Sequence, residues 1–263
     1  MDKGIVIKSN VLEILERQLS ARAKKKQYGF VAVGSATDAY MRHEEKFKLT
    51  EGILQLLLKY RFPVFISTKS TLILRDIELL KEIDKSAILP NNLKKNFNRG
   101  AILSVSLSTV ERKITDMLEP GASTPQQRLE TVQQLKKEGF FVGINAIPIL
   151  PFISDTDDHL EKMITAAKRH EADYILVGGL TLFGQDAADS KPLYFNFLKR
   201  FDPSLLPLYE KLYGINFYPP KKYLEELKSK SEKICIEHNI RTSILNTHVK
   251  SIKGDTESAP ELF

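Results

Sequence analysis

The sequence predicts an α/β fold in which parallel strands alternate with helices and form a partial, TIM-like barrel. Five short runs of apolar and β-branched residues predict the strands, and they begin at residues 30, 64, 101, 141 and 174. Successive starts are therefore 33 to 40 residues apart, and each interval contains a helical pattern. Repeated βα units of this length require parallel strands joined by right-handed crossovers. Five strands are too few for a closed barrel of eight, so we expect an open one.

The predicted strands cover residues 30–33, 64–67, 101–107, 141–148 and 174–180. Residues 5–8 are either one short additional strand or the end of a loop. We expect a helix over residues 11–25 before the first strand and another from Thr50 to Arg61, which stops there because the next residue precedes Pro63. The clearest helix signal begins at Thr124, where Pro125 takes the first helical position, Gln127 completes a capping box and Gly139 follows the end.

The strand rhythm stops after Leu182, and helical stretches follow over residues 193–200, 203–213 and 220–238. We therefore expect three parts. These are a βα barrel over residues 1–190, a C-terminal helical extension over residues 191–250, and a flexible polar tail over residues 251–263.

The composition is that of an ordinary globular protein, with 42% hydrophobic and 27% charged residues in a chain of 263. This balance excludes collagen-like, mucin-like and disordered chains. A net charge of +6 is mildly basic and permits an anionic ligand without requiring one. The single cysteine, Cys235, excludes an intrachain disulfide and suits a reducing cytosol. No apolar run approaches the roughly 18 residues of a membrane span, so we expect a cytoplasmic protein that does not enter a membrane.

Polar residues follow the predicted strands, at the edge where parallel βα folds bind their ligands. Ser104 and Ser106 share one face of the third strand, because side chains two residues apart point the same way. They either line a polar ligand site or face solvent and a neighbouring loop. Lys69 ends an apolar strand and must reach water or an anion. Asp38 either accepts from a cationic amine or caps the next turn.

These strand ends resemble those of the radical S-adenosylmethionine (SAM) proteins, in the branch similar to spore photoproduct lyase. The resemblance covers residues 4–182 and rests on the segments at residues 34–40, 65–70, 118–122 and 148–151, together with Arg128. It implies a partial barrel of six βα units that holds SAM across the strand ends above a [4Fe-4S] cluster.

The resemblance also implies roles for individual residues. Thr37 and Asp38 would lie near the methionyl amine of SAM, Lys69 and Ser106 near its carboxylate or ribose, and Ala146 beside its adenine. Ser104 would belong to the same site. Arg128 would orient the SAM carboxylate through the loop at Glu119, or would only form an ion pair on its helix.

The sequence departs from this family at the cluster, which three cysteines hold in a Cys-x3-Cys-x2-Cys loop after the first barrel strand. This chain has Cys235 alone, on an apolar stretch of a predicted helix, where we expect an inert thiol. We therefore expect a truncated or misannotated product that begins at an internal methionine and lacks the first strand and the cluster loop. Ser35 and Ala36 stand where DNA-repairing members keep a hydrogen-donor cysteine, so repair of thymine dimers is not expected.

Three functions remain open. The first is a lyase-like radical SAM enzyme that forms a 5'-deoxyadenosyl radical, receives electrons from a flavodoxin- or ferredoxin-type donor, and acts on a small molecule or nucleic acid. The second is a cluster-less remnant that binds SAM or a nucleoside without catalysis. The third is a nucleic-acid-binding module that uses the +6 charge. The sequence assigns no catalytic residue and no metal ligand.

Other polar groups have simpler interpretations. The acids at Asp155, Asp157 and Asp158 complement a helix dipole better than they indicate a metal. His43 lies in a charged loop, and we expect it to be solvated rather than catalytic. The three lysines at residues 24–26 end a helix before they indicate a nucleic-acid patch.

Overall fold

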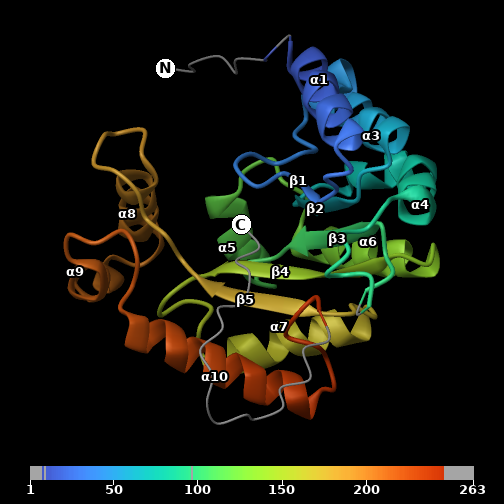
Figure 1. Cartoon of the computed structure of the whole chain (residues 1–263). Helices are drawn as coiled ribbons and strands as arrows, with labels where there is room; N and C mark the ends of the chain where they lie inside the picture. Colours follow the sequence, from blue (N-terminus) through green and yellow to red (C-terminus); the bar gives the residue numbers. More distant parts are fainter. Residues whose placement is uncertain (1–7, 9, 96, 246–263) are drawn as a thin grey trace, which may run out of the picture.

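The computed structural model describes residues 8, 10–95 and 97–245, and within them five strands form one parallel sheet. The strands lie side by side in chain order (Figure 1): β1 (Val31–Val33), β2 (Val64–Thr68), β3 (Ala101–Ser106), β4 (Phe141–Ile149) and β5 (Ile175–Gly179). Each predicted strand is confirmed, with ends displaced by at most one residue. Residues 5–7 of the possible extra strand, and the predicted tail, lie outside the described residues.

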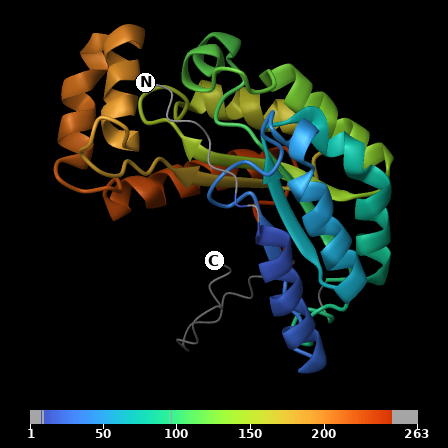
Figure 2. The same cartoon turned by 90° about the horizontal axis from the view of Figure 1, so that it is seen from above.

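Helices connect the strands and cover the outer face of the curved sheet, as Figures 1 and 2 show. Those up to β5 are α1 (Val11–Lys24), α2 (Glu44–Phe47), α3 (Leu49–Tyr60), the 3-10 helix η1 (Thr71–Asp76), α4 (Ile77–Ser86), α5 (Arg112–Leu118), α6 (Pro125–Lys137) and α7 (Asp157–Arg169). After β5 come α8 (Ser190–Phe201), the 3-10 helix η2 (Pro203–Leu205), α9 (Leu206–Tyr213) and α10 (Lys221–Glu237). The predicted partial α/β barrel is confirmed.

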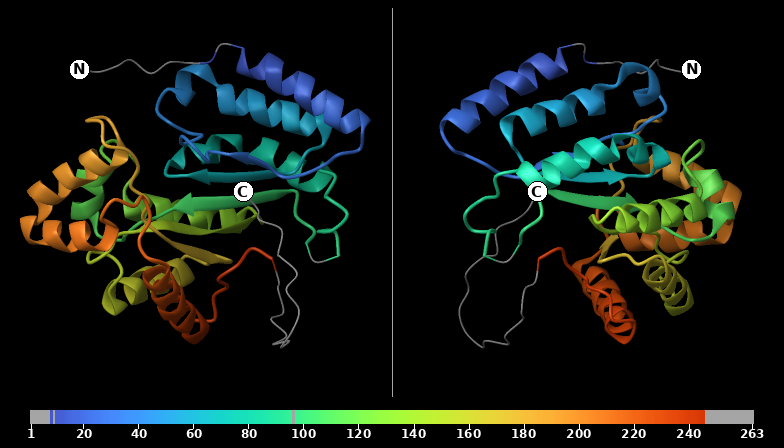
Figure 3. Two further views of the ribbon diagram at one scale, coloured as in Figure 1. Left: turned by 60° about the vertical axis from the view of Figure 1, so that its left-hand side comes forward. Right: turned by 90° about the vertical axis from the view of Figure 1, so that its right-hand side faces the viewer.

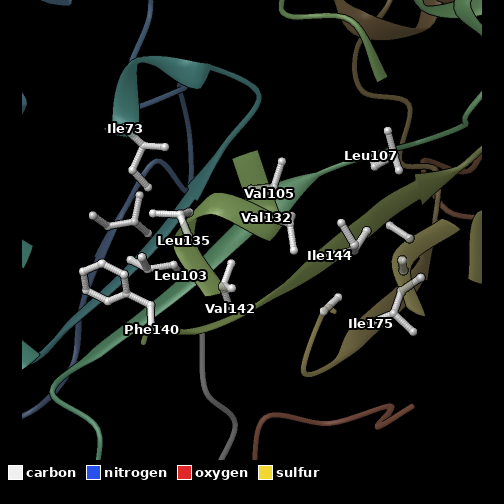
Figure 4. Close-up of a cluster of buried hydrophobic side chains, with 14 of the residues drawn as sticks. Ile73, Leu103, Val105, Leu107, Val132, Leu135, Phe140, Val142, Ile144 and Ile175 are labelled. Carbon is white, nitrogen blue, oxygen red and sulfur yellow. The ribbon is translucent and has the colours of Figure 1, made fainter. Parts of the chain in front are cut away.

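The main core lies between the sheet and these helices. Alternate residues of each strand point outward into it, and Figure 4 shows Leu103, Val105, Val142 and Ile144 beside Val132 of α6. All five are at most 1% exposed. The residues between them in the strands point to the other, inner face of the sheet. By this alternation the inner face carries Phe65, Ile102 and Phe141 near the amino ends of the strands and polar residues near their carboxyl ends.

Local signals set the helix ends as the sequence predicts. The Thr124 side chain accepts from the Gln127 amide, and the Gln127 side chain accepts from the Thr124 amide, which completes the capping box of α6. Helix α3 ends at Arg61, whose φ of 61° is left-handed. Helix α7 is capped by the Thr156 hydroxyl, with Asp157 in its first turn.

Helices α8 and α9 form a second, smaller core with the loops that follow β4 and β5. The Tyr209 hydroxyl donates to the Pro151 carbonyl at 2.5 Å, and the Tyr213 hydroxyl donates to the Leu180 carbonyl at 2.8 Å. Both tyrosines are at most 1% exposed. Helix α10 instead packs against β5 and α7, and the boundary at residue 190 stays a prediction. Within the described ranges, no helix combines the length and apolarity that crossing a bilayer requires.

The charged segment around His43 combines an exposed histidine with a buried carboxylate. His43 itself is exposed, but Glu44 is only 6% exposed. The Glu44 carboxylate accepts from the Thr50 amide at 3.0 Å and pairs with Arg75 at 2.9 Å. Arg75 also bonds both carboxylate oxygens of Asp76. The segment is therefore fastened to α3 and η1 by a buried ionic cluster, while His43 itself is exposed to solvent, as the sequence predicts.

Candidate functional site

The carboxyl ends of the strands point toward α5, α8 and α9 (Figure 3, left). There the inner face of the sheet carries a row of small polar side chains from three strands. The hydroxyl oxygens of Ser67 and Ser106 lie 3.0 Å apart, and the amide of Asn145 donates to Ser67 at 3.2 Å. Ser104 lies on the same face of β3 as Ser106 and is fully buried. Both serines are therefore buried on this face and do not face solvent.

This row, Ser67, Ser104, Ser106 and Asn145, is called the polar row below. Two of its atoms, Ser104 Oγ and Asn145 Oδ1, are buried and form no hydrogen bond to another described residue, although the Tyr174 hydroxyl, which donates to the Leu103 carbonyl, lies close to Ser104. A buried polar atom without a partner costs about 1 to 3 kcal/mol, so most such atoms meet water or a ligand. The polar row consequently has capacity for an additional polar molecule.

Asp38 organises the loops beside this row. Its carboxylate accepts from the Tyr40 amide at 2.8 Å, the Thr68 hydroxyl at 2.6 Å and the Lys69 amide at 2.6 Å. Close approach of β1 to β2 depends on Gly34, because a Cβ there would lie 2.3 Å from the Ser67 carbonyl oxygen. Within the chain, the contacts of Asp38 are therefore those of a residue that caps a turn. The remaining lone pairs of its carboxylate can accept hydrogen bonds from a ligand.

Two ion pairs that share one carboxylate lie at the end of β2, and they join Lys69, Glu119 and Arg128. This group is called the relay below. Glu119 lies between the two cations, 2.8 Å from Lys69 Nζ and 2.5 Å from Arg128 Nη2. Arg128 also donates to the carbonyls of Ser106 and Ser123, at 3.1 and 2.7 Å. Arg128 is 1% exposed, whereas the Lys69 side chain is 37% exposed. Lys69 is thus the member of the relay that a ligand can reach.

The relay holds Glu119 in its ionised form. Burial alone would raise the pKa of this carboxyl, but the charges and hydrogen bonds of Lys69 and Arg128 outweigh burial and hold its pKa below the ordinary value. Together with Asp38, the site has two cations and two carboxylates near the same strand ends. Their charges balance, so the site is dipolar rather than strongly positive or negative.

A pocket of about 250 Å³ opens beside the relay. It is lined by Glu119, Arg128 and the loop at residues 120–124, which leads into α6. The Ser123 hydroxyl accepts from the Thr71 amide at 3.2 Å and so joins this loop to the start of η1. The pocket lining does not include the polar row, which lies on the inner face of the sheet.

Two predicted site residues stand apart from the others. Thr37 is exposed on the loop just before Asp38. Ala146 is fully buried in the main core with Val142 and Ile144, and its side chain therefore points to the outer face of β4. The structure brings Asp38, Lys69, Ser104, Ser106 and Arg128 together, and leaves only the backbone of Ala146 near the inner face.

Sequence reasoning overlooked two members of the polar row, Ser67 and Asn145. The signal was available, because Asn145 pairs with Ser106 in the sheet register and alternates with the apolar Ile144 and Ala146. Strand alternation therefore favoured Asn145 over Ala146 as the inward-facing residue of β4.

The comparisons with known proteins begin with the sequence. No protein-family model matches it. The chain is 27% identical over 239 residues to "Uncharacterized protein Rv2578c" of Mycobacterium tuberculosis, an alignment that covers 91% of this chain and 65% of that protein. It is 25% identical over 153 residues to "Uncharacterized protein MJ0683" of Methanocaldococcus jannaschii, covering 58% of this chain and 50% of the relative. The chain thus spans about two thirds or less of the length of these relatives.

The structural comparison decides the fold. A solved structure of a spore photoproduct lyase variant with bound AdoMet and dinucleoside spore photoproduct superposes with a TM-score of 0.58 at 15% identity. The match covers 87% of this chain and 64% of that one. The chain has the radical SAM fold. This agrees with the resemblance of the strand ends, and the low identity limits the conclusion to the fold.

The iron–sulfur cluster of radical SAM enzymes does not fit the residues of this chain. The single cysteine, Cys235, is fully buried in the main core on α10, far along the chain from the strand ends. Burial raises the pKa of its thiol to about 12, so the thiolate that ligates iron is disfavoured. Across residues 8, 10–95 and 97–245, no three His, Cys, Asp or Glu side chains form a metal-binding group.

Proposed function

We propose that this chain binds SAM, or a nucleoside closely related to it, on the inner face of the sheet at the carboxyl ends of the strands. The observation that carries the proposal is the polar row, where Ser104 Oγ and Asn145 Oδ1 are buried without partners. The relay of Lys69 is joined to this row through Arg128, which donates to the Ser106 carbonyl. A ligand with several hydroxyl and amine groups supplies the missing hydrogen bonds. AdoMet binding by the spore photoproduct lyase variant of the same fold supports this choice.

The residues suit the separate parts of SAM. The exposed end of Lys69 matches the methionyl carboxylate, and Asp38 and Thr37 match the ammonium group. Ser104, Ser106 and Asn145 provide donors and acceptors for the ribose. A zwitterionic amino-acid group has no net charge, which agrees with the balanced charges of Asp38, Lys69, Glu119 and Arg128.

Binding of a carboxylate would require Lys69 to be shared with, or released from, Glu119. Arg128 makes this feasible, because it keeps Glu119 paired at 2.5 Å when Lys69 turns to the ligand. No buried carboxylate is then left without a cation. Arg128 is therefore proposed as a positioning residue, one that holds Glu119 and the Ser106 carbonyl rather than touching SAM.

The proposal stops at binding for these 263 residues. Formation of a 5'-deoxyadenosyl radical, a lyase-like reaction on a substrate and the use of a flavodoxin- or ferredoxin-type electron donor stay predictions from the resemblance. No step through a cluster is derived, because the residues present do not fit one.

Calorimetric titration with S-adenosylhomocysteine tests the proposal, since this analogue lacks the sulfonium but keeps the amino acid, ribose and adenine. We expect measurable binding by the parent chain and a loss of at least about 30-fold in affinity for Lys69→Ala, because truncating one partner of a partly shielded charge contact costs about 2 kcal/mol or more.

Lys81→Ala is the matched control. Lys81 is 36% exposed against 37% for Lys69, and it pairs with Glu138 at 2.7 Å against 2.8 Å for Lys69 and Glu119. Its affinity should equal that of the parent. Equal affinities of all three proteins, or binding by the parent no stronger than by an unrelated protein, would show that the strand-end residues are structural only.

A further inference from the structure

A second pocket lies at the opposite end of the barrel from the polar row. It has a volume of about 660 Å³ and is lined by residues 26–28, between α1 and β1, and by residues 88–92 and 94, after α4. Both segments lie at the amino ends of the strands, away from α8 and α9 (Figure 3, left). It is called the lysine pocket below. Nothing in the proposed SAM site involves it.

The charges around the lysine pocket all have one sign. Lys24 ends α1 and is followed by Lys25 and Lys26, while Lys94 and Lys95 lie after α4. Residues 20–28 and 88–95 contain no acidic residue. All five lysines are exposed. In the part of the chain that the structure describes, none of them forms an ion pair, and Lys94 Nζ instead donates to the Asn91 side chain at 3.1 Å. Their charges are therefore available to an outside anion.

The helix dipole does not account for so many cations. The carboxyl end of a helix carries about half a negative charge, and its effect is confined to the last turn. Lys24 lies in the last turn of α1 and can balance it, whereas Lys25 and Lys26 lie beyond the helix. An excess of several positive charges remains at the lysine pocket.

The backbone at Lys26 adopts a conformation that favours glycine. Lys26 has a φ of 54°, in the left-handed region, at the end of a helix where glycine is the favoured residue. Its amide bonds the Ala23 carbonyl and the Gln27 amide bonds the Arg22 carbonyl, which is the usual pattern for a glycine-ended helix. A lysine there is less favourable for folding than glycine, so Lys26 can be replaced by glycine without loss of stability.

The other wall of the lysine pocket is apolar. Ile88, Leu89 and Pro90 line it, together with the half-buried ring of Tyr28, which packs against Phe62 with centroids 5.0 Å apart. An apolar wall with an aromatic ring beside lysines suits a ligand that joins a flat base to a phosphate. Lysine binds phosphate as a mobile point charge.

We propose that the lysine pocket binds the phosphate groups of a nucleotide or a nucleic acid, with a base against Tyr28 and Pro90. The site is independent of the strand-end site, so it stands whether or not the chain binds SAM. A nucleic acid is favoured over a free nucleotide, because the lysines extend beyond the pocket lining to Lys24, Lys25 and Lys95.

Lys26→Gly tests this directly, because it removes one charge while relieving the left-handed strain. We expect equal or greater resistance to urea, and weaker binding of a fluorescein-labelled single-stranded DNA by anisotropy. The affinity should fall about fivefold at roughly 0.1 M salt, and the slope of log affinity against log salt should decrease by about 0.7, as expected for one lost phosphate contact. Lys94→Ala should act in the same way.

Lys48→Gly is the matched control, because Lys48 has a φ of 50° and loses the same charge at the junction of α2 and α3. Its DNA affinity should equal that of the parent.

Competition by ATP distinguishes a free nucleotide from a nucleic acid as the ligand. Displacement of the DNA by ATP at comparable concentration indicates a nucleotide site, and weak displacement indicates a nucleic-acid site. Equal affinities of Lys26→Gly, Lys48→Gly and the parent, or equal competition by poly-glutamate, would overturn the proposal.

Discussion

Individual residues at the strand ends are held by contacts that sequence alone does not reveal. Glu119 is shared between Lys69 and Arg128, which lie 50 residues before it and 9 residues after it. The sequence predicts that Arg128 acts through the loop at Glu119 or forms an ion pair on its own helix, and the structure pairs it with Glu119, which lies before α6. The sequence does not predict that Lys69 joins them, because that contact depends on how two loops meet above the sheet.

The relay makes stability depend on pH through Glu119. The pKa of this carboxyl is held below its ordinary value of 4.5, so ionisation favours the folded state. The stabilisation is complete above the ordinary value and is lost as the pH falls through the lowered folded value. Glu119→Gln also leaves Arg128 buried without its partner, so we expect the free energy of unfolding at neutral pH to fall by about 3 kcal/mol or more.

Urea unfolding from neutral to acidic pH measures this effect. The difference between the parent and Glu119→Gln should shrink below about pH 4.5. Glu225→Gln is a suitable control, because its pair with Lys221 is exposed on α10 and should contribute under about 1 kcal/mol at any pH. A difference for Glu119→Gln that does not change with pH would contradict the charged relay.

At the scale of whole elements, periodicity and capping signals predict the structure well. All five strands and the ends of α1, α3, α6 and α10 agree with the sequence within about two residues, because each is fixed by local backbone preference and by a buried apolar side. The short helix α2 and the cluster of Glu44, Arg75 and Asp76 were not predicted. Their contacts join segments 31 residues apart and leave no local periodic pattern.

The packing of β4 against the start of β5 depends on one glycine. A Cβ at Gly143 would lie 2.4 to 2.6 Å from the backbone and ring of Tyr174. Tyr174 cannot move away easily, because it is fully buried and its hydroxyl donates to the Leu103 carbonyl at 2.8 Å. We expect Gly143→Ala to lower the free energy of unfolding by about 1 to 3 kcal/mol, the usual cost of an overpacked core.

Gly29→Ala is the control for this substitution, since a Cβ at Gly29 would meet nothing within 4 Å. Its stability should equal that of the parent or exceed it slightly, because alanine reduces the freedom of the unfolded chain. Urea denaturation of the three proteins makes the comparison. Equal stability of Gly143→Ala and Gly29→Ala would show that the sheet tolerates a side chain beneath Tyr174.

For the molecule as a whole, the sequence predicts the fold class and the edge of the sheet where polar residues gather. It assigns Ala146 to the site without Asn145, although the alternation of β4 turns the Asn145 side chain inward and the Ala146 side chain outward. Helical periodicity predicts α8 and α9 but not the second core that they form. The tyrosines of this core donate hydrogen bonds to carbonyls 58 and 33 residues away, and such distant contacts leave no local pattern.

The central claim is that the polar row and Lys69 form one ligand site on the inner face of the sheet. A crystal structure of the chain with S-adenosylhomocysteine tests it most directly. The account predicts ligand density at the strand ends, with the amino-acid carboxylate at Lys69 and hydroxyl groups bonded to Ser104 and Asn145. Density elsewhere on the protein, with Ser104 and Asn145 still without partners and Lys69 still paired only with Glu119, would contradict it.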